Sequence, residues 1–302
     1  MRSRVSKRRS SKRTRRPRKT TRRSYRKKTR SMARSRTGSR KAILNLTSRK
    51  KRNTMLGFSN TSGTGLSTPV TIKPLVVSGV SGHISLWCAT AQTLVTAAAT
   101  NSVVDQAART ATTCYMRGLT ESMRITTNSG RPWFWRRICF LTKARVAEPS
   151  PSPINSETPY IDTSQGISRQ WLNLSINNSD PLILGIQDKI FRGRQGTDWD
   201  DLLVAPTDPT RITVKYDKLR TFRSGNEEGT VASAKLWHPM NHNLVYGDDE
   251  NADGEDTSPY STTAKPGMGD YYVVDIIVAG TGATTSDLLQ LRSVSTLYWH
   301  ER

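Results

Sequence analysis

The sequence predicts an all-β protein, and three observations lead to this prediction. From Ile43 onward, runs of strand length that are rich in apolar and β-branched residues are separated by clusters of Gly, Pro, Ser, Asn and Asp. Several runs place apolar and polar side chains on opposite faces, the period of a half-buried strand. No strand is followed by a Gly-rich turn and a helical pattern, which disfavours a doubly wound α/β fold. Eight to ten strands with long loops favour a sandwich or a jelly roll of two packed antiparallel sheets.

Ten runs are expected to form strands. Tyr271–Ala279 is apolar on both faces apart from Asp275, as expected of a central, buried strand. In the last run the leucines share one face, a pattern that Ser293 and Ser295 interrupt. In chain order the ten runs are Thr54–Ser59, His83–Ala91, Cys114–Thr127, Trp133–Lys143, Trp171–Ile176, Leu182–Phe191, Arg211–Phe222, Ala232–His238, Tyr271–Ala279 and Leu289–Trp299.

Helical patterns are weak throughout the chain. Leu94–Ala108 is rich in Ala and Thr, and we expect a short helix or a surface loop there. A Pro-rich segment over residues 147–166 and an acid-rich segment over residues 247–269 are expected to be exposed loops.

Charge is concentrated at the N-terminus. Residues 1–52 contain 25 of the 47 Lys and Arg residues and no acid, and the whole chain is formally +23. Residues 53–302 therefore hold 22 basic and 24 acidic side chains, a net charge of −2. Residues 1–41 have too few apolar side chains to offset the entropy of ordering, so we expect a disordered arm over 1–41 and a folded domain over 42–302.

A charge of this density needs a polyanion as its partner, and nucleic acid is the usual one. Short basic clusters in the arm also have the composition of nuclear import signals. The expected phosphate-binding residues are Arg2, Arg4, Lys7, Arg8, Arg9, Lys12, Arg13, Arg15, Arg16, Arg18, Lys19, Arg22, Arg23, Arg26, Lys27, Lys28, Arg30, Arg34, Arg36, Arg40, Lys41, Arg49, Lys50, Lys51 and Arg52. The expected import residues are Lys7, Arg8, Arg9, Arg15, Arg16, Arg18 and Lys19. The last four cations, Arg49 to Arg52, are expected to lead into the first strand.

One segment of the body combines aromatic rings with guanidinium groups. Trp133, Trp135, Arg136 and Arg137 form a pattern that stacks bases and holds phosphates in single-strand-binding proteins. On a strand, Trp133, Trp135 and Arg137 share one face. The alternative is that these tryptophans belong to a β core or to a subunit contact.

Three cysteines, Cys88, Cys114 and Cys139, form no C-x-x-C pair and are expected to be reduced, buried thiols. A disulfide or a zinc site is the alternative. The chain has no apolar run long enough for a transmembrane helix and no apolar segment of a secretory signal near its start, so we expect no membrane partner and a cytosolic or nuclear setting.

No catalytic site, cofactor or resident metal is expected. His238 and His242 have the spacing of two zinc ligands on a helix, but Pro239 disfavours a helix there, and loop histidines beside a strand end are expected instead. Residues 249–254 resemble the start of a calcium loop, but Tyr260 stands where the bidentate Glu is required. A solvated acidic turn is the expectation.

Residues 43–61, with the sequence ILNLTSRKKRNTMLGFSNT, join the arm to the first strand. This junction resembles the corresponding region in capsid proteins of genomoviruses, the gemycircularvirus-like viruses with small circular single-stranded DNA genomes. The basic N-terminus, the β-rich body of this size and the last run of the chain are similar to that family as well, and also fit geminivirus-like and circovirus-like capsid proteins.

The resemblance implies a single eight-stranded jelly roll that assembles, as sixty identical subunits with T=1 symmetry, into an icosahedral shell around circular single-stranded DNA. It further implies a virion protein that enters the host nucleus through import receptors. Sixty arms would bring about 1,500 positive charges, which neutralise most of a strand on the order of two thousand nucleotides. The alternatives are a ribosomal or chromatin-like nucleic-acid-binding protein that forms no shell, and a zinc hydrolase built on His238 and His242.

Overall fold

The computed structural model describes residues 40–301 apart from 97–98, 147–157, 165 and 178. Contacts divide the chain into two compact units, residues 1–44 and residues 45–302. The described part of the first unit is the start of one helix, and the expectations for the arm over residues 1–39 lie outside the described residues. All of the strands among the described residues belong to the second unit.

The protein is mostly β, with 52% of it in strands and 8% in helices. The elements are α1 (Arg40–Thr47), β1 (Arg49–Thr61), β2 (Ser67–Ile72), β3 (Leu75–Ser78), β4 (His83–Cys88), β5 (Val95–Thr96), β6 (Ala99–Thr100), β7 (Thr113–Thr127), β8 (Trp133–Thr142), β9 (Ile161–Thr163), β10 (Gly166–Trp171), the 3-10 helix η1 (Leu174–Ile176), α2 (Asp180–Ile190), β11 (Thr213–Phe222), β12 (Val231–Val245), β13 (Asp249–Asn251), β14 (Gly254–Asp256), β15 (Asp270–Ala279) and β16 (Leu288–Glu301).

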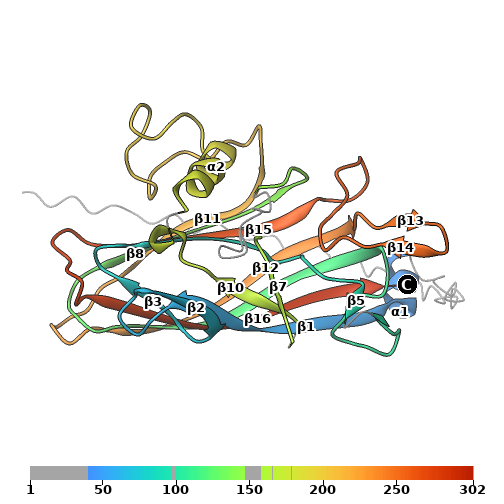
Figure 1. The fold of residues 1–302 in the computed structure, drawn as a ribbon, viewed down its shortest axis with the longest axis horizontal. Coiled ribbons are helices and arrows are strands. Elements are labelled where there is room, and N and C mark those ends of the chain that lie inside the picture. The colour runs from blue at the N-terminus through green and yellow to red at the C-terminus, as the bar shows by residue number, and fades with distance from the viewer. Residues whose placement is uncertain (1–39, 97–98, 147–157, 165, 178, 302) are drawn as a thin grey trace, which may run out of the picture. The chain divides into compact units, whose positions relative to one another are not determined.

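Two sheets carry most of the strands (Figure 1). The first sheet has the order β12-β7-β16-β1-β10-β9, with β2 paired to β1 and β3 paired to β16. The second sheet has the order β11-β8-β15-β4. All pairs in these sheets are antiparallel except β1 with β10, which is parallel. Helix α2 covers the second sheet on the side away from the first sheet (Figure 1).

Apolar side chains fill the space between the two sheets in two clusters. One cluster includes Met116, Leu119 and Trp299, and the other includes Ile125, Trp133 and Leu291. A third cluster lies under α2, where residues of the helix meet the outer face of the second sheet. Burying these side chains supplies the main driving force for folding, because each large apolar side chain gains roughly 2 kcal/mol.

Eight of the ten expected strands lie wholly or mostly within observed strands, and two expectations are wrong. Trp171–Ile176 is the end of β10 followed by η1, and Leu182–Phe191 belongs to α2. In that segment Ile186 and Ile190 face the core at helical spacing, and a proline in the first turn starts the helix. A hydrophobic run of this length is compatible with a strand or with a helix. The spacing of its buried residues and the proline at its start favour the helix.

The expected loops are partly confirmed. The described residues of 94–108, which exclude 97–98, form a loop with the short pair β5 and β6 as its regular structure, so the loop alternative holds for them. Most of the Pro-rich segment lies outside the described residues, and its described end contains β9. The acid-rich segment contains the hairpin β13–β14. Among the helices in the described ranges, none is long and apolar enough to cross a membrane.

Candidate nucleic-acid interface

The first sheet has an outer face, turned away from the second sheet, and β1 shows how the sequence defines it. Lys51 and Met55 are buried, whereas Lys50, Arg52 and Leu56 are exposed, so even-numbered side chains at the start of β1 point outward. Arg49 to Arg52 are the first residues of β1 itself, not only the approach to it. The basic N-terminal region therefore continues directly into this face.

The neighbouring strands add more cations to the same face. Arg117 and Arg124 alternate with the buried residues of β7, Lys235 does so on β12, and Arg292 on β16. With Lys50 and Arg52, this gives six Lys or Arg residues on the outer face, and among the described residues of these four strands no Asp or Glu points to that side. We call these six residues the basic face: Lys50, Arg52, Arg117, Arg124, Lys235 and Arg292.

Two members of the basic face oppose each other directly. Arg124 of β7 pairs in register with Arg292 of β16, and both side chains are exposed. Like charges directly across an antiparallel pair are destabilising. Six cations without a carboxylate among them produce a positive potential that an anionic ligand would relieve.

Aromatic side chains accompany the cations at one end of this face. Trp237 of β12 is half exposed, and its ring lies 6.1 Å from the ring of Tyr298 of β16, centroid to centroid. Tyr298 pairs in register with Arg52. These rings help to line a surface pocket of about 410 Å³, together with Lys50, Arg117 and His300. Cations beside exposed rings are the combination that binds single-stranded nucleic acid.

Lys51 is an exception among the predicted phosphate-binding residues. Its ammonium group is buried, lies 3.0 Å from the carboxylate of Glu301 and donates hydrogen bonds to Thr110 Oγ1 and to the carbonyl of Ala108. It ties the start of β1 to the end of β16 and offers nothing to a phosphate. Arg49, Lys50 and Arg52 are exposed, as phosphate binding requires.

The structure corrects the second predicted nucleic-acid segment. Trp133, Trp135, Arg136 and Arg137 are all buried, so no ring is free to stack on a base. The two tryptophans belong to the apolar cluster between the sheets, as the core alternative states. Arg136 donates to both carboxylate oxygens of Asp217, at 3.0 and 2.7 Å, and also to the backbone carbonyls of Leu202 and Ala205, which follow α2 in the chain.

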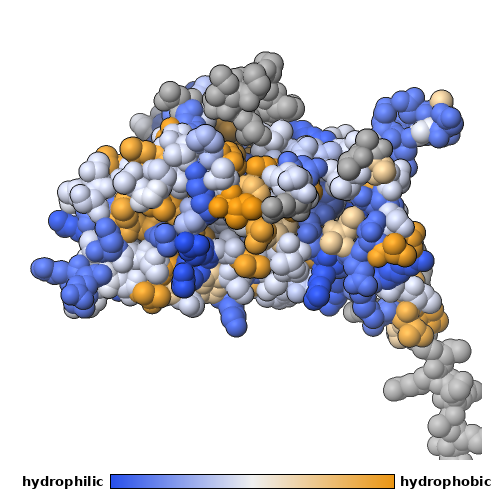
Figure 2. All heavy atoms as spheres, turned by 60° about the horizontal axis from the view of Figure 1, so that its bottom comes forward, coloured by the Kyte–Doolittle hydropathy of each residue, from blue (hydrophilic) through white to orange (hydrophobic). Residues whose placement is uncertain are grey.

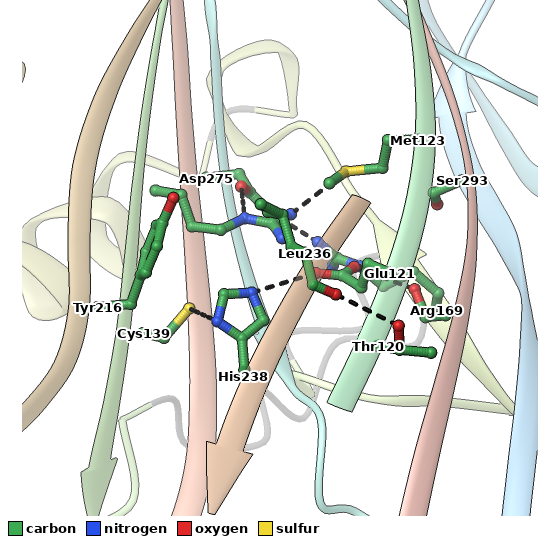
Figure 3. Close-up of polar contacts among 12 residues, drawn as sticks. Thr120, Glu121, Met123, Cys139, Arg169, Tyr216, Leu236, His238, Asp275 and Ser293 are labelled. Carbon is green, nitrogen blue, oxygen red and sulfur yellow. Dashed lines mark hydrogen bonds and ion pairs between the residues drawn. The ribbon is translucent and has the colours of Figure 1, made fainter. Parts of the chain in front are cut away.

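A buried network that includes Glu121, Arg169 and Asp275 crosses from one sheet to the other (Figure 3). Arg137 belongs to this network as well. Its guanidinium donates to Asp275 of β15 at 2.7 Å and to Glu121 of β7. Arg169 of β10 donates to the same two carboxylates, at 3.2 Å to Glu121 and 2.7 Å to Asp275. Two cations and two anions make the network neutral, which is how a core accommodates buried charge.

The network keeps its carboxylates ionised. Burial alone would raise the pKa of Glu121 and of Asp275, but the two guanidiniums outweigh that effect and lower both. The pKa of Asp275 falls to about 2. Trp135 adds a hydrogen bond from its indole N–H to Asp275 at 2.9 Å.

His238 and His242 lie in different environments. Both histidines lie within β12, not in a loop, on either side of a bulge between Pro239 and His242. His238 is buried, with its ring between Cys139 and Glu121 (Figure 3), whereas His242 is exposed. Burial lowers the pKa of His238 to about 4, with a further contribution from Arg137, so its ring is neutral at pH 7. In the described ranges no three His, Cys, Asp or Glu side chains are grouped so that they could hold a metal ion.

The three cysteines are free and buried, as expected. Burial raises the pKa of each thiol, to about 12 for Cys139, so they remain protonated. The calcium-like segment forms the hairpin β13–β14, whose residues are all exposed, in agreement with a solvated acidic turn. It projects from the surface as a hydrophilic finger at the upper right of Figure 2.

No family model and no curated protein sequence matches this chain. The assignment of function therefore depends on the residues and on the geometry described above.

The sequence analysis did not predict most of the basic face, although the sequence contains a pattern that marks part of it. Lys235 and Trp237 alternate with Ala234, Leu236 and His238, which marks one polar and one buried face on that run. The sequence does not say that β12, β7, β16 and β1 are neighbours. Only that adjacency brings their isolated cations onto one surface.

Proposed function

We propose that this chain is the coat protein of a small icosahedral virus and that it packages circular single-stranded DNA. The observation that carries the proposal is the basic face, six cations with no acid among them. Two of the six, Lys50 and Arg52, are also the end of the N-terminal group of 25 cations in residues 1–52. A polyanion with many phosphates can neutralise the cations of the N-terminal region and those of the basic face at the same time. The resemblance of residues 43–61 to genomovirus capsid proteins points to single-stranded DNA as that polyanion.

Strand pairing supports a jelly roll as the fold behind this function. Counting the long strands and β4 in chain order gives eight: β1, β4, β7, β8, β11, β12, β15 and β16. The first pairs with the last, β4 with β15, β7 with β12, and β8 with β11. This nesting, divided over two four-stranded layers, is the pattern obtained when one long hairpin is rolled into two sheets.

The division of charge supports a shell. Residues 53–302 have a net charge of only −2, so copies of the body can pack side by side without strong repulsion. In a shell of sixty copies, the N-terminal cations and the basic face would line the interior and meet the DNA. Import receptors of the host would recognise the same N-terminal clusters before assembly.

The experiment is to express the full chain and examine it by negative-stain electron microscopy. We expect uniform particles, and we expect nuclease-protected nucleic acid extracted from them to be single-stranded DNA. Monomers or small oligomers that bind nucleic acid without forming particles would favour the ribosomal or chromatin-like alternative instead.

A further inference from the structure

The pocket at the aromatic end of the basic face has features that neutralising phosphates does not require. Its volume of about 410 Å³ is in the range of small-molecule sites. Trp237 is 51% exposed, while each of the other six tryptophans is at most 8% exposed. Trp237 is therefore the tryptophan whose ring is accessible for stacking with a ligand.

Backbone geometry allows the indole to lie close against the sheet. Gly118 of β7 lies below Trp237, and a Cβ at position 118 would come within 2.7 Å of Trp237 Cζ2 and 2.5 Å of the His238 carbonyl. The glycine, with a φ of 153°, lets the ring lie close to the sheet. Tyr298 is inclined at 58° to the indole, so the two rings form two sides of the pocket.

Cations stand around these rings. Lys50 and Arg117 line the pocket, and Arg117 Nη1 donates to Asn241 Oδ1 at 2.6 Å, which orients its guanidinium. Burial lowers the pKa of His300, and the positive charges of Arg117 and Lys50 lower it further. The pocket therefore has a positive potential and a neutral imidazole at pH 7.

We propose that this pocket binds one unpaired nucleotide, with its base stacked on Trp237 beside Tyr298 and its flanking phosphates on Arg117 and Lys50. The proposal rests on the proposed packaging function and adds a site that selects single strands. A base in a duplex is stacked on both sides and cannot present its face to Trp237, whereas an unpaired base can. Basic residues alone do not make this distinction.

The other occupant to consider is the acidic hairpin β13–β14 of a second copy. Its carboxylates complement the cations, but its residues 249–256 include no aromatic side chain to complement the exposed ring of Trp237 and the half-buried ring of Tyr298. A nucleotide satisfies the rings and the cations together. The nucleotide is therefore the occupant that this pocket fits.

Fluorescence tests the proposal in the full chain, because Trp237 is the only well-exposed tryptophan among the seven. The protein, at about 0.2 M salt to weaken the N-terminal contacts, is titrated with an oligonucleotide of about ten thymidines and with a duplex of equal length. We expect the single strand to quench the emission and to protect it from acrylamide, and the duplex to do neither. Because both Trp237 variants lack the reporting indole, their binding is followed by the anisotropy of a dye-labelled oligonucleotide. In that measurement Trp237→Ala should lower the preference for the single strand by about tenfold, and Trp237→Phe should retain most of it.

The matched control is Val231→Ala, because Val231 is on the same strand and face and is 70% exposed. It should leave the preference unchanged. Equal quenching by duplex and single strand, or an unchanged preference in Trp237→Ala, overturns the nucleotide site while packaging stands. Protection of Trp237 in particles free of nucleic acid assigns the pocket to a second copy and also overturns it. If no oligonucleotide binds at all, the packaging function fails together with the site.

Discussion

Glu121 is the residue that joins the two sheets electrostatically. Its carboxylate accepts hydrogen bonds from Arg137, Arg169 and Ser295, and His238 Nε2 lies 3.9 Å away. These groups form a polar belt between the two apolar clusters of the sandwich. A belt of this kind stabilises the fold only while every charge keeps its partner.

Removing one charge from the belt should therefore be costly. Glu121→Gln keeps the shape of the side chain but leaves Arg137 and Arg169 with a single buried carboxylate, that of Asp275. We expect the free energy of unfolding to fall by about 3–5 kcal/mol, measured by urea unfolding of the dissociated protein. Ser122→Ala, at the exposed neighbouring position, should change it by less than about 0.5 kcal/mol. Similar values for the two variants would contradict the role given to the belt.

His238 should make the fold sensitive to acid. The pKa of His238 is about 4 in the folded protein and 6.5 in the unfolded chain. Between these pH values the unfolded chain therefore binds a proton at this residue that the folded protein does not bind. Stability should fall as pH falls from 6.5 towards 4, by about 2 kcal/mol for this residue at pH 4.5. Comparing unfolding at pH 7 and 4.5, His238→Gln should lose that much less than the wild type. An equal loss in both proteins would exclude His238 as the cause.

At the scale of strands and sheets, the proposed function depends on which strands are adjacent. The basic face exists because β12, β7, β16 and β1 lie side by side, each contributing one or two cations from its outer positions. Arg124 and Arg292 meet across a strand pair with no carboxylate to separate them. A phosphate bound between them would turn a repulsion into two attractions.

This arrangement predicts a change in salt dependence. Changing Arg124 and Arg292 together to Gln should lower the slope of log K against log salt by about 1.4 for single-stranded DNA, since each phosphate contact contributes about 0.7. Lys215→Gln with Lys218→Gln makes the same charge change on the exposed side chains of β11 in the second sheet. That control should leave the slope unchanged. If both pairs lower it equally, the basic face is not a specific surface.

Alternation in the sequence predicts most of the strands, and it also marks part of the buried belt. Asp275 interrupts an apolar strand, and Ser295 interrupts the leucine face of the last run, at the level where Glu121 lies between the sheets. Neither interruption identifies its partner, because partners come from strands far apart in the chain. The burial of Lys51 could not be predicted for the same reason, since its partner Glu301 is at the other end of the sequence.

The error at α2 has a different cause. Residues 182–191 are as apolar as a buried strand, and only the helical spacing of Ile186 and Ile190 with the preceding proline distinguishes the two structures. The error at Trp133 and Trp135 arises because aromatic residues beside arginines suit a core and a nucleic-acid surface equally well. Tertiary packing decides between them, and here it buries both rings.

For the whole molecule, the central feature is the separation of charge along the chain. Residues 1–52 hold 25 cations and no acid, and the rest of the chain has a net charge of −2. We propose that the first part binds the DNA and that the near-neutral body builds the shell. The basic face then adds a second, weaker layer of contacts on the wall itself.

Deleting residues 2–41 tests this account most directly, with nuclease-protected DNA per unit of protein as the measurement. The shortened chain keeps every strand that the structure describes, so its thermal unfolding should resemble that of the full chain. We predict that its protected DNA falls close to zero, because 21 of the 25 N-terminal cations are removed and only Arg49 to Arg52 remain. Protected DNA at the level of the full chain would contradict the account.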